Sequence, residues 1–494
     1  MYLFKTTAQP CQVLAGIFLW LFFTATSLAS PWISVGETRL KQNLHLLNDT
    51  GVLSMSLTTW PIMWSDVQSA VNEIDESQLN KAQLIALKEL KFEMRFQTKK
   101  EMKRSLELAA SSSRAVFRDF SAQEYEKGRI SHVFDWDGSD LSFKLQANLT
   151  TDPGEDAVES QLYGSYIAGV VGNWVLGVGA IDRWWGASSQ SSLILGNNAR
   201  PVPGAFFRTK GTQQFETPLL SWLGGWQFVS YVGQLEGNRF ISEAKVTGMR
   251  FTFQPFESLE IGLSRAMQWG GEGRSESLNA FWKSLTSQGE NEIGEESGNQ
   301  LAGYDLRYNF LRAQSYGASL YAQLIGEDEA GYLPSKFLSQ AGLEFNVALN
   351  SGNSLNLFIE HTNTTAGSIG GKQFNTAYDH SSYKTGYRHR GRTLGATYDN
   401  DAKVYSGGLS YQFGDLAQRV SSVLSRIELN ADGTAGGNTV SAVALDIYSI
   451  DLSYQQLFFN GKLNLMASYL TELPSLLVDD YDKFNLGLNW TYRF

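Results

Sequence analysis

The sequence predicts a transmembrane β-barrel of about eighteen antiparallel strands, preceded by a small α-helical bundle. Three observations carry this prediction. Apolar residues recur with helical spacing up to residue 113 and alternate with polar residues after it. The alternating segments are about ten residues long and end in aromatic residues, as membrane-crossing strands do. Short and long connections alternate between them, which is typical of barrels with turns on one side and loops on the other.

The first residues predict a signal peptide, residues 1–29. Lys5 precedes an apolar run from Val13 to Phe23, and Ser27-Leu28-Ala29 offers small residues for cleavage. The run is too short to cross a bilayer as a helix, and an internal buried helix is the alternative. The one cysteine, Cys11, lies in this segment. We therefore expect a mature chain without disulfides or a lipid anchor.

The helical spacing of apolar residues predicts a periplasmic bundle of three or four helices over residues 30–113. Gly51 is a plausible helix end, and Ser65 and Ser77 are plausible helix starts. The tryptophans of "TTWPIMW" (58–64) are expected to pack inside the bundle. The apolar positions with helical spacing are Leu40, Leu44, Leu47, Val67, Val71, Ile74, Leu84, Leu87 and Leu90.

Residues 114–494 predict the barrel. A soluble sandwich also shows alternation, but its inner face is a dry core, whereas here the face opposite the apolar one carries charged residues. Phe494 closes an aromatic strand and resembles the signal read by the barrel-assembly machinery. An even strand number places both barrel ends, and therefore the helical region, in the periplasm; we expect a monomer. The last strand shows the pattern best, with Phe484, Leu486, Leu488, Trp490, Tyr492 and Phe494 on one face.

The connections support the same arrangement. Short turns are expected near 172–173, 223–225, 255–257, 311–313, 350–353, 413–416 and 460–461. Longer polar loops are expected at 151–159, 269–300, 326–338, 363–403, 430–439 and 472–481. The long loops belong at the extracellular end.

Composition and charge exclude several classes of function. The formal net charge of −10 becomes about −11 once Lys5 is removed, which disfavours nucleic acid as a partner. Five histidines are present, but no Ser-His pair or metal-spaced pair stands out, so we expect no catalysis, cofactor or metal site. "DNDA" (399–402) offers too few oxygen ligands for a complete Ca²⁺ site.

A first candidate binding segment is "DRWWGASSQSSLILGNNARPVPG", residues 182–204. Paired tryptophans can stack on sugar rings, and arginine and asparagine can donate to hydroxyls and carboxylates. The alternative is that the tryptophans belong to the interfacial aromatic girdle and the arginines to salt bridges in the lumen. The candidate residues are Arg183, Trp184, Trp185, Asn197, Asn198 and Arg200.

A second candidate segment, residues 379–402, is a basic patch. No acidic residue lies between Asp379 and Asp399. Arginine pairs with carboxylates through two hydrogen bonds, so uronic acids or pyruvylated sugars are natural ligands. The alternative is an arginine ladder that faces carboxylates of the lumen. The candidate residues are Tyr383, Tyr387, Arg388, Arg390 and Arg392, with Lys384, His380 and His389 beside them.

Three motifs closely resemble the Wzi family of capsule-assembly outer-membrane proteins. They are "DRWWG…SLILGNNARPVP", "DHSSYKTGYRHRGRTLGATYDNDA" and "LLNDTGVLSMSLTTWPIMW". The resemblance covers essentially the whole mature chain. It implies an eighteen-stranded barrel with a periplasmic helical bundle, in the outer membrane of a Gram-negative bacterium, acting as a lectin that holds capsular polysaccharide at the cell surface.

The expected function is therefore an outer-membrane lectin that binds and anchors an acidic capsular or other exopolysaccharide. Outer-membrane lipid and, during biogenesis, the barrel-assembly machinery are the other expected partners. A sugar-selective porin is the alternative, because the same barrel with arginines and aromatic residues in an open lumen would conduct. Conductance in planar bilayers separates the two hypotheses.

Overall fold

The structure is a computed structural model that describes most of the chain. It covers residues 32–494 apart from 139, 155–159, 287–297, 331–332, 369–370, 415–416, 435 and 478–480. The expected signal peptide, residues 1–29, lies outside the described residues.

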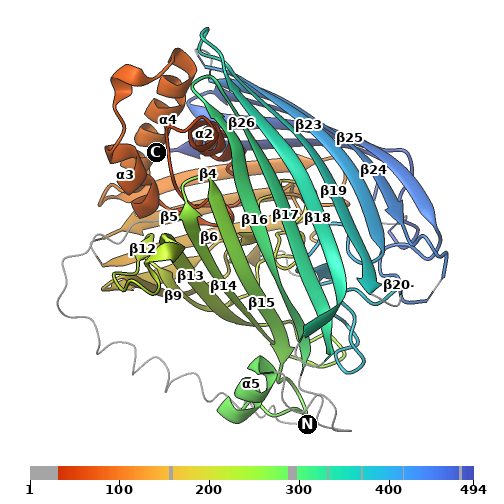
Figure 1. Cartoon of the computed structure of the whole chain (residues 1–494). Coiled ribbons are helices and arrows are strands. Elements are labelled where there is room, and N and C mark those ends of the chain that lie inside the picture. Colours follow the sequence, from red (N-terminus) through yellow and green to blue (C-terminus); the bar gives the residue numbers. More distant parts are fainter. Residues whose placement is uncertain are drawn as a thin grey trace, which may run out of the picture.

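The chain forms a closed antiparallel barrel of eighteen strands, as the sequence predicts (Figure 1). Three short pieces, β7 (Ser160–Gln161), β12 (Gln213–Gln214) and β20 (Gly371–Gln373), extend the sheet. The strands are β4 (Met102–Ser111), β5 (Gly128–Asp137), β6 (Leu141–Thr151), β8 (Tyr166–Val171), β9 (Trp174–Gly179), β11 (Gly204–Thr209), β13 (Gly225–Gln234), β14 (Lys245–Phe256), β15 (Leu259–Trp269), β16 (Asn299–Ala313), β17 (Tyr316–Ala330), β18 (Leu333–Ala348), β19 (Ser354–Ser368), β23 (Ala402–Phe413), β24 (Gln418–Leu429), β25 (Leu445–Phe458), β26 (Gly461–Leu470) and β27 (Phe484–Arg493).

The barrel begins earlier in the chain than we expected. Strand β4 pairs with β27 and closes the ring, with Leu108 opposite Trp490. We expected residues 102–111 to belong to the helical region. Arg104 interrupts the apolar face of this strand, which also carries Leu106 and Leu108. The boundary therefore lies before Met102 and not after residue 113.

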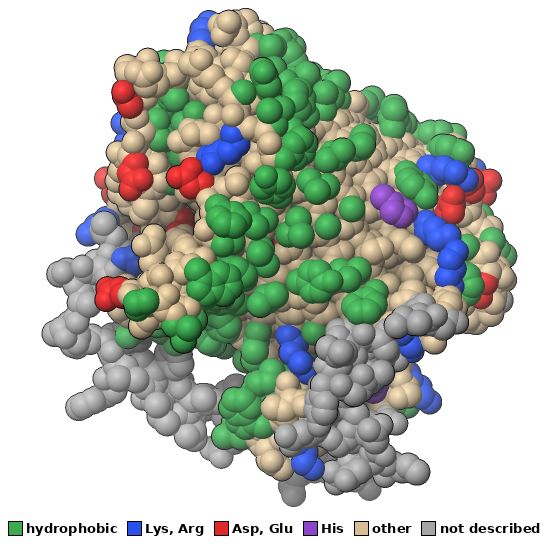
Figure 2. Space-filling model, in the orientation of Figure 1, with side chains coloured by type: hydrophobic (Ala, Val, Ile, Leu, Met, Phe, Trp, Pro, Cys, Tyr) green, Lys and Arg blue, Asp and Glu red, His purple; other side chains and the backbone are tan. Residues whose placement is uncertain are grey.

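The outer face of the barrel is apolar (Figure 2). Leucines such as Leu263, Leu424 and Leu486 point outward and are 48%, 59% and 51% exposed. Inward-facing positions on the same strands carry polar and charged side chains. This distribution suits lipid outside and polar groups inside. No helix in the described part of the chain has the length and apolar composition needed to cross a bilayer.

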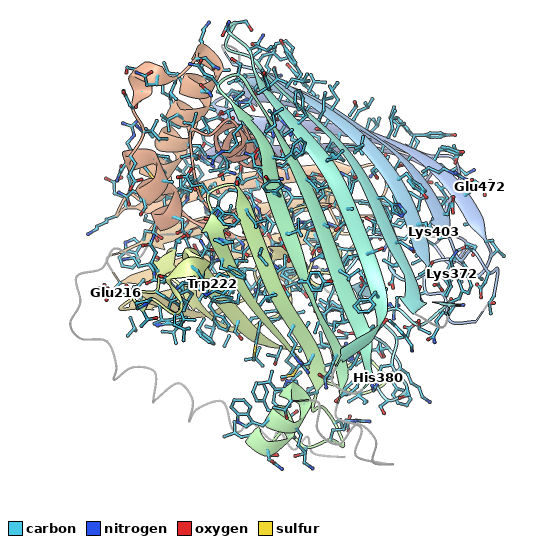
Figure 3. The ribbon with its side chains drawn as sticks, viewed as in Figure 1. Glu216, Trp222, Lys372, His380, Lys403 and Glu472 are labelled. Carbon is cyan, nitrogen blue, oxygen red and sulfur yellow. The ribbon has the colours of Figure 1, made fainter. Side chains whose placement is uncertain are left out.

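The two mouths of the barrel differ in their connections. At one mouth, strands are joined by short turns such as 172–173, 257–258 and 314–315. At the other, long segments join them, which identifies that mouth as extracellular. The side chains of Lys372, His380, Lys403 and Glu472 lie at the extracellular end (Figure 3). One expected loop is shorter: β17 and β18 continue to Ala330 and from Leu333, so most of 326–338 is strand.

Three helices lie at the mouth with the short turns (Figure 1). They are α2 (Thr38–Asp49), α3 (Trp64–Asn72) and α4 (Lys81–Gln97). Trp60 and Trp64 are buried among their apolar faces, as predicted. Asn80 caps α4 through a reciprocal capping box with Gln83, so this helix starts after Ser77 and not at it. The N-cap of α3 is Met63 and not Ser65.

Helix α2 is seated inside the barrel mouth. Arg307 on β16 donates to Asp49 of α2 and to Glu344 on β18, both at 2.7 Å. His45 of α2 also lies 2.9 Å from Glu344. The helix approaches β17 so closely that a Cβ on Gly317 would lie 2.1 Å from the Asp49 carbonyl oxygen. Buried ion pairs and a glycine therefore fix the helix against the wall.

Three segments enter the lumen from the extracellular mouth: 112–127, 180–203 and 374–401. The second contains β10 (Trp184–Trp185), which pairs with β2 (Thr59–Trp60) of the N-terminal region. A further pair joins β1 (Trp32–Ile33) to β3 (Ile62–Met63). The extracellular segments also bond to each other, because Gly196 donates to the Leu394 carbonyl at 2.8 Å. Together with α2, they fill the lumen.

Candidate functional site

The second candidate segment contains a short β-hairpin with a two-residue turn, at the extracellular end. Its strands are β21 (Arg388–His389) and β22 (Arg392–Thr393). The tip residues Arg390 and Gly391 both have positive φ, 49° and 75°. Such a turn favours asparagine, aspartate or glycine at its first position, so arginine at the tip carries a conformational cost. Strained backbone of this kind is concentrated at functional sites.

Arg388 anchors the hairpin and does not face a ligand. Its side chain is buried and forms two hydrogen bonds with Asp399, at 2.6 and 2.8 Å. A third contact joins it to Asp379 at 2.5 Å. These carboxylates hold the pKa of Arg388 well above its usual range despite burial. Both partners come from the same segment, so Arg388 is not part of a ladder on the barrel wall.

Arg390 and Arg392 line a cavity of about 120 Å³ at the extracellular end. Asn198 and Arg200, from the first candidate segment, line the same cavity. Two segments almost two hundred residues apart therefore bring four of the predicted residues together. Other residues that line it include Arg114, Tyr125 and Tyr481.

Tyr125 organises the cationic side of this cavity. Its hydroxyl donates to the carbonyls of Asn197 and Ala199, at 2.9 and 2.5 Å. The guanidinium carbons of Arg118 and Arg200 lie 3.4 and 4.4 Å from the centre of its ring. Stacking on an aromatic face can hold guanidinium groups near each other even where not every one is paired with a carboxylate. The site is thus rich in positive charge relative to the acidic chain around it.

Glu126 is the acidic group closest to Arg200. The two side chains are 3.1 Å apart and both are buried. Burial lowers the pKa of Arg200, and the charge of Glu126 acts in the opposite direction. Burial raises the pKa of Glu126, again opposed by Arg200. Arginine remains protonated in proteins, so the site keeps its cation.

Trp184 and Trp185 are packed in the lumen and have no open ring face. They are 0% and 1% exposed. Trp184 meets the edge of Phe120 at 5.6 Å between ring centres and donates to the Ser188 carbonyl at 3.0 Å. This differs from both readings of the sequence, a sugar-stacking pair and an interfacial girdle. The reason is the pairing of this segment with the N-terminal region, which the sequence does not reveal.

The remaining predicted residues are also buried. Arg183 lies 4.4 Å over the Tyr231 ring, and burial lowers its pKa to about 10. Asn197 is 1% exposed and lies outside the arginine-lined cavity. Tyr383 donates to the Gly270 carbonyl at 3.1 Å, and Tyr387 is 1% exposed. These side chains support the segments that carry the site.

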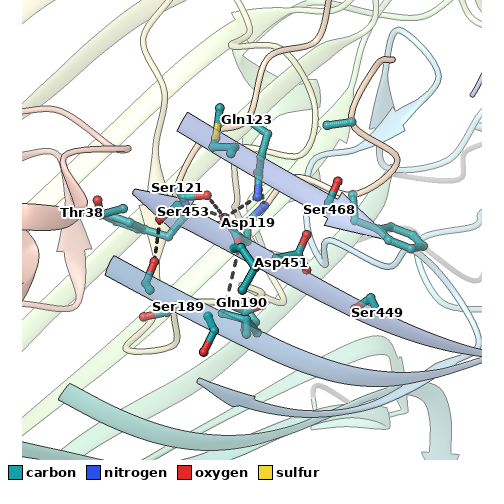
Figure 4. Close-up of a pocket in the computed structure, with 18 of the residues that line it drawn as sticks. Thr38, Asp119, Ser121, Gln123, Ser189, Gln190, Ser449, Asp451, Ser453 and Ser468 are labelled. Carbon is teal, nitrogen blue, oxygen red and sulfur yellow. Dashed lines mark hydrogen bonds between the residues drawn. The ribbon is translucent and has the colours of Figure 1, made fainter. Parts of the chain in front are cut away.

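A second cavity, of about 180 Å³, lies inside the barrel between α2, the segment 112–127 and β24–β27 (Figure 4). Hydroxyls of Ser189, Ser449 and Ser453 line it, and Asp119 and Asp451 also face it. Burial raises the pKa of Asp119. Among the described residues, no three histidine, cysteine or acidic side chains are grouped as metal ligands. Both polar and apolar side chains line this chamber, which lies among the segments that enter the lumen.

Sequence reasoning missed the contribution of the segment 112–127. Arg114, Arg118 and Tyr125 come from it, between the first two strands. The signal was present as arginine and aromatic residues in "RAVFRDFSAQEYEKGR". Because residues 102–111 are expected in the helical region, the sequence does not place 112–127 between two strands and so does not identify it as an extracellular loop.

Comparison with known proteins identifies the family. Residues 97–476 match the family described as "Capsule assembly protein Wzi". The chain belongs to the Wzi family. The resemblance inferred from three sequence motifs is therefore confirmed. Placement in the outer membrane agrees with the barrel and with this family.

Two relatives show how far the likeness to Wzi extends. A Klebsiella pneumoniae protein, described as an uncharacterized 55.8 kDa protein in the cps region, is 32% identical over 313 residues. The match covers 63% of this chain and 61% of that protein. A solved Wzi structure from Escherichia coli is 27% identical, with a TM-score of 0.82, covering 94% of this chain and all of the other. That protein is described as a carbohydrate-binding β-barrel involved in group 1 capsule assembly.

Proposed function

We propose that this protein binds an acidic polysaccharide at its extracellular mouth and retains capsular or related exopolysaccharide at the cell surface. The observation that carries the proposal is the cavity lined by Arg200, Arg390 and Arg392. The positive charge of its arginines attracts carboxylates, and Arg392 is held at the cavity by donating to the carbonyls of Ala115 and Val116. Membership of the Wzi family and the carbohydrate binding described for the Escherichia coli relative support it.

The filled lumen favours binding over transport. The N-terminal region and three extracellular segments meet inside the barrel through β2 and β10. Within the described residues, the internal cavity is bounded by α2 at the periplasmic side and by the segment 112–127. A sugar-selective porin requires a continuous aqueous path, and these contacts obstruct it.

The proposal is tested with Arg390→Gln/Arg392→Gln in cells that make an acidic capsule. Each well-formed charge-assisted hydrogen bond contributes about 1.5–3 kcal/mol, so we expect polysaccharide to shift from cells to medium. Cell-associated and released uronic acid are measured on the same cultures. Binding of a soluble polyuronate oligosaccharide to the purified barrel should also weaken in this variant, and binding to the parent barrel should weaken as salt rises, because exposed charges are screened.

Arg95→Gln is the matched control. Arg95 is exposed on α4 at the opposite mouth, where it donates to the Lys91 carbonyl at 3.1 Å. Both variants should show the heat-modifiable migration of a folded barrel. Unchanged polysaccharide retention and oligosaccharide binding in the double variant would contradict the proposal.

A further inference from the structure

The barrel wall is lowest at three neighbouring strands, β8, β9 and β11. β8, β9 and β11 have six residues each, whereas β16 to β19 have 15 or 16. Gly179 and Gly204 are paired at the ends of β9 and β11, and beyond them the chain turns into the lumen. On the side that faces β8, the end of β6 pairs with the short piece β7 (Asn148 with Gln161, Leu149 with Ser160). A notch in the wall results.

A cavity of about 630 Å³ occupies this notch. Its volume falls within the roughly 300–1,000 Å³ of small-molecule sites. Leu162, Val178 and Pro203 form its apolar wall. Leu162 and Val178 are 60% and 46% exposed on the outer face of the barrel. On the neighbouring strand β8, Ile167 is paired with Val178 and is equally exposed at 46%, so the cavity continues the lipid-facing surface.

The inner end of the cavity is cationic. Arg390 lines it and also lines the arginine-rich cavity at the extracellular mouth. A hydrogen bond joins Arg390 to Tyr163, which stands in the same notch. Gln161 connects the two cavities as well, because Arg200 donates to its Oε1 at 3.2 Å. The strained tip of the hairpin thus places one guanidinium where an apolar, membrane-facing wall meets a polar site.

The geometry points to a binding site for a phosphorylated glycolipid of the outer leaflet in this notch. Its acyl chain lies against Leu162, Val178 and Pro203, and its phosphate meets Arg390. Apolar surface continuous with the membrane selects the chain, and the guanidinium selects the anionic headgroup. The site is separate from polysaccharide binding in its ligand, because a soluble oligosaccharide has no acyl chain to fill the apolar wall.

The test uses the full mature barrel in neutral detergent and native mass spectrometry. The probe is diphosphoryl lipid A, a phosphorylated and acylated disaccharide, compared with the same lipid after removal of both phosphates. We expect one retained lipid per barrel, at least tenfold weaker binding of the dephosphorylated lipid, and at least tenfold weaker binding by Arg390→Gln. Arg390→Lys, which keeps the charge, should stay within threefold of the parent.

Lys403→Gln is the control, since Lys403 is a basic residue of the extracellular end on β23, across the barrel. It should bind the lipid within twofold of the parent. Equal binding by Arg390→Gln in a heat-modifiable barrel, or equal retention of both lipid forms, would overturn the assignment. Displacement of the lipid by millimolar inorganic phosphate would also overturn it, by showing a simple anion site. Loss of oligosaccharide binding with intact lipid binding would instead contradict only the proposed polysaccharide function.

Discussion

Trp184 is in antiparallel backbone register with Trp60 inside the barrel. One tryptophan enters on a segment from the extracellular mouth and the other on the N-terminal region. Phe120 stands between them, with ring centres 4.9 Å from Trp60 and 5.6 Å from Trp184. Three segments from the two mouths therefore share one aromatic contact. Because they pack on one another, unfolding of one segment should destabilise the others.

Trp184→Ala should loosen both sides of this contact. Removing a buried tryptophan side chain costs about 3–5 kcal/mol through lost packing and the cavity left behind. Hydrogen exchange should rise together in residues 54–60 and 180–203. Trp222→Ala is the control, because Trp222 is 61% exposed in a turn at the periplasmic mouth. Faster exchange in 180–203 alone would show that the two segments are not coupled.

Arg307→Met should release α2 from the barrel mouth. The substitution leaves Asp49 and Glu344 buried without their shared cation, at a cost of about 3–5 kcal/mol. Limited proteolysis should then cut within 50–58, a region the parent protects. Arg312→Met removes an ion pair with Glu257, whose side chain is 74% exposed, and should change stability by about 1 kcal/mol or less. Equal protection of both variants would contradict the role of Arg307.

Arg388→Gln should destabilise the hairpin, in contrast to Arg390→Gln. It leaves Asp379 and Asp399 without their buried cation, again at about 3–5 kcal/mol. We expect faster exchange across 379–402 and a lower melting temperature. Arg390→Gln should leave the melting temperature nearly unchanged, because its guanidinium faces the cavities. A similar melting temperature for Arg388→Gln and the parent would contradict this division of roles.

The segment 374–401 should become less protected as pH rises. Burial and the neighbouring carboxylates Asp432 and Asp379 raise the pKa of Asp401 from 3.8 to about 6. The folded state therefore holds this proton more tightly, and the stabilisation is fully present below pH 3.8 and lost as pH rises through 6. Exchange of 371–380, corrected for its intrinsic rate, should be slower at pH 5 than at pH 8. Asp401→Asn should remove most of this difference. If exchange in the variant keeps the pH dependence of the parent, a group other than Asp401 causes it.

Planar-bilayer recordings should show no large open-channel current for the parent protein. The lumen contains the β2–β10 pair and the ion pairs of α2, which leave no wide aqueous path through the described residues. A general porin reconstituted in the same bilayer is the positive control. Stable ohmic steps of comparable size would revive the porin hypothesis.

Local periodicity was sufficient to predict most of the fold. Alternation with a period of two identified the barrel because each strand has one lipid-facing and one lumen-facing side. It failed at β4, where Arg104 interrupts the apolar face. The exact helix starts also differed, since Asn80 and not Ser77 caps α4.

The site was predicted only in part, because composition identifies a polar segment but not which of its side chains faces inward. Arg390 lines cavities, whereas Arg388, two residues earlier, is an anchor bound to Asp399, and Arg392 lines a cavity while donating to the Ala115 carbonyl. Trp184 looked like a surface aromatic and is a core residue, since its strand partner lies more than a hundred residues away. Such long-range pairing leaves no local mark in the sequence.

Gly317 gives a way to interpret other sequences of this kind. Any side chain here would collide with the Asp49 carbonyl, so α2 can sit against β17 only if this position is glycine. In an alignment of related barrels, glycine at this register position should occur together with the acidic residue that ends the helix and the arginine that binds it. A chain that has lost the glycine should have lost that pair too. Glycine at this position would then serve as an evolutionary marker of whether α2 is docked.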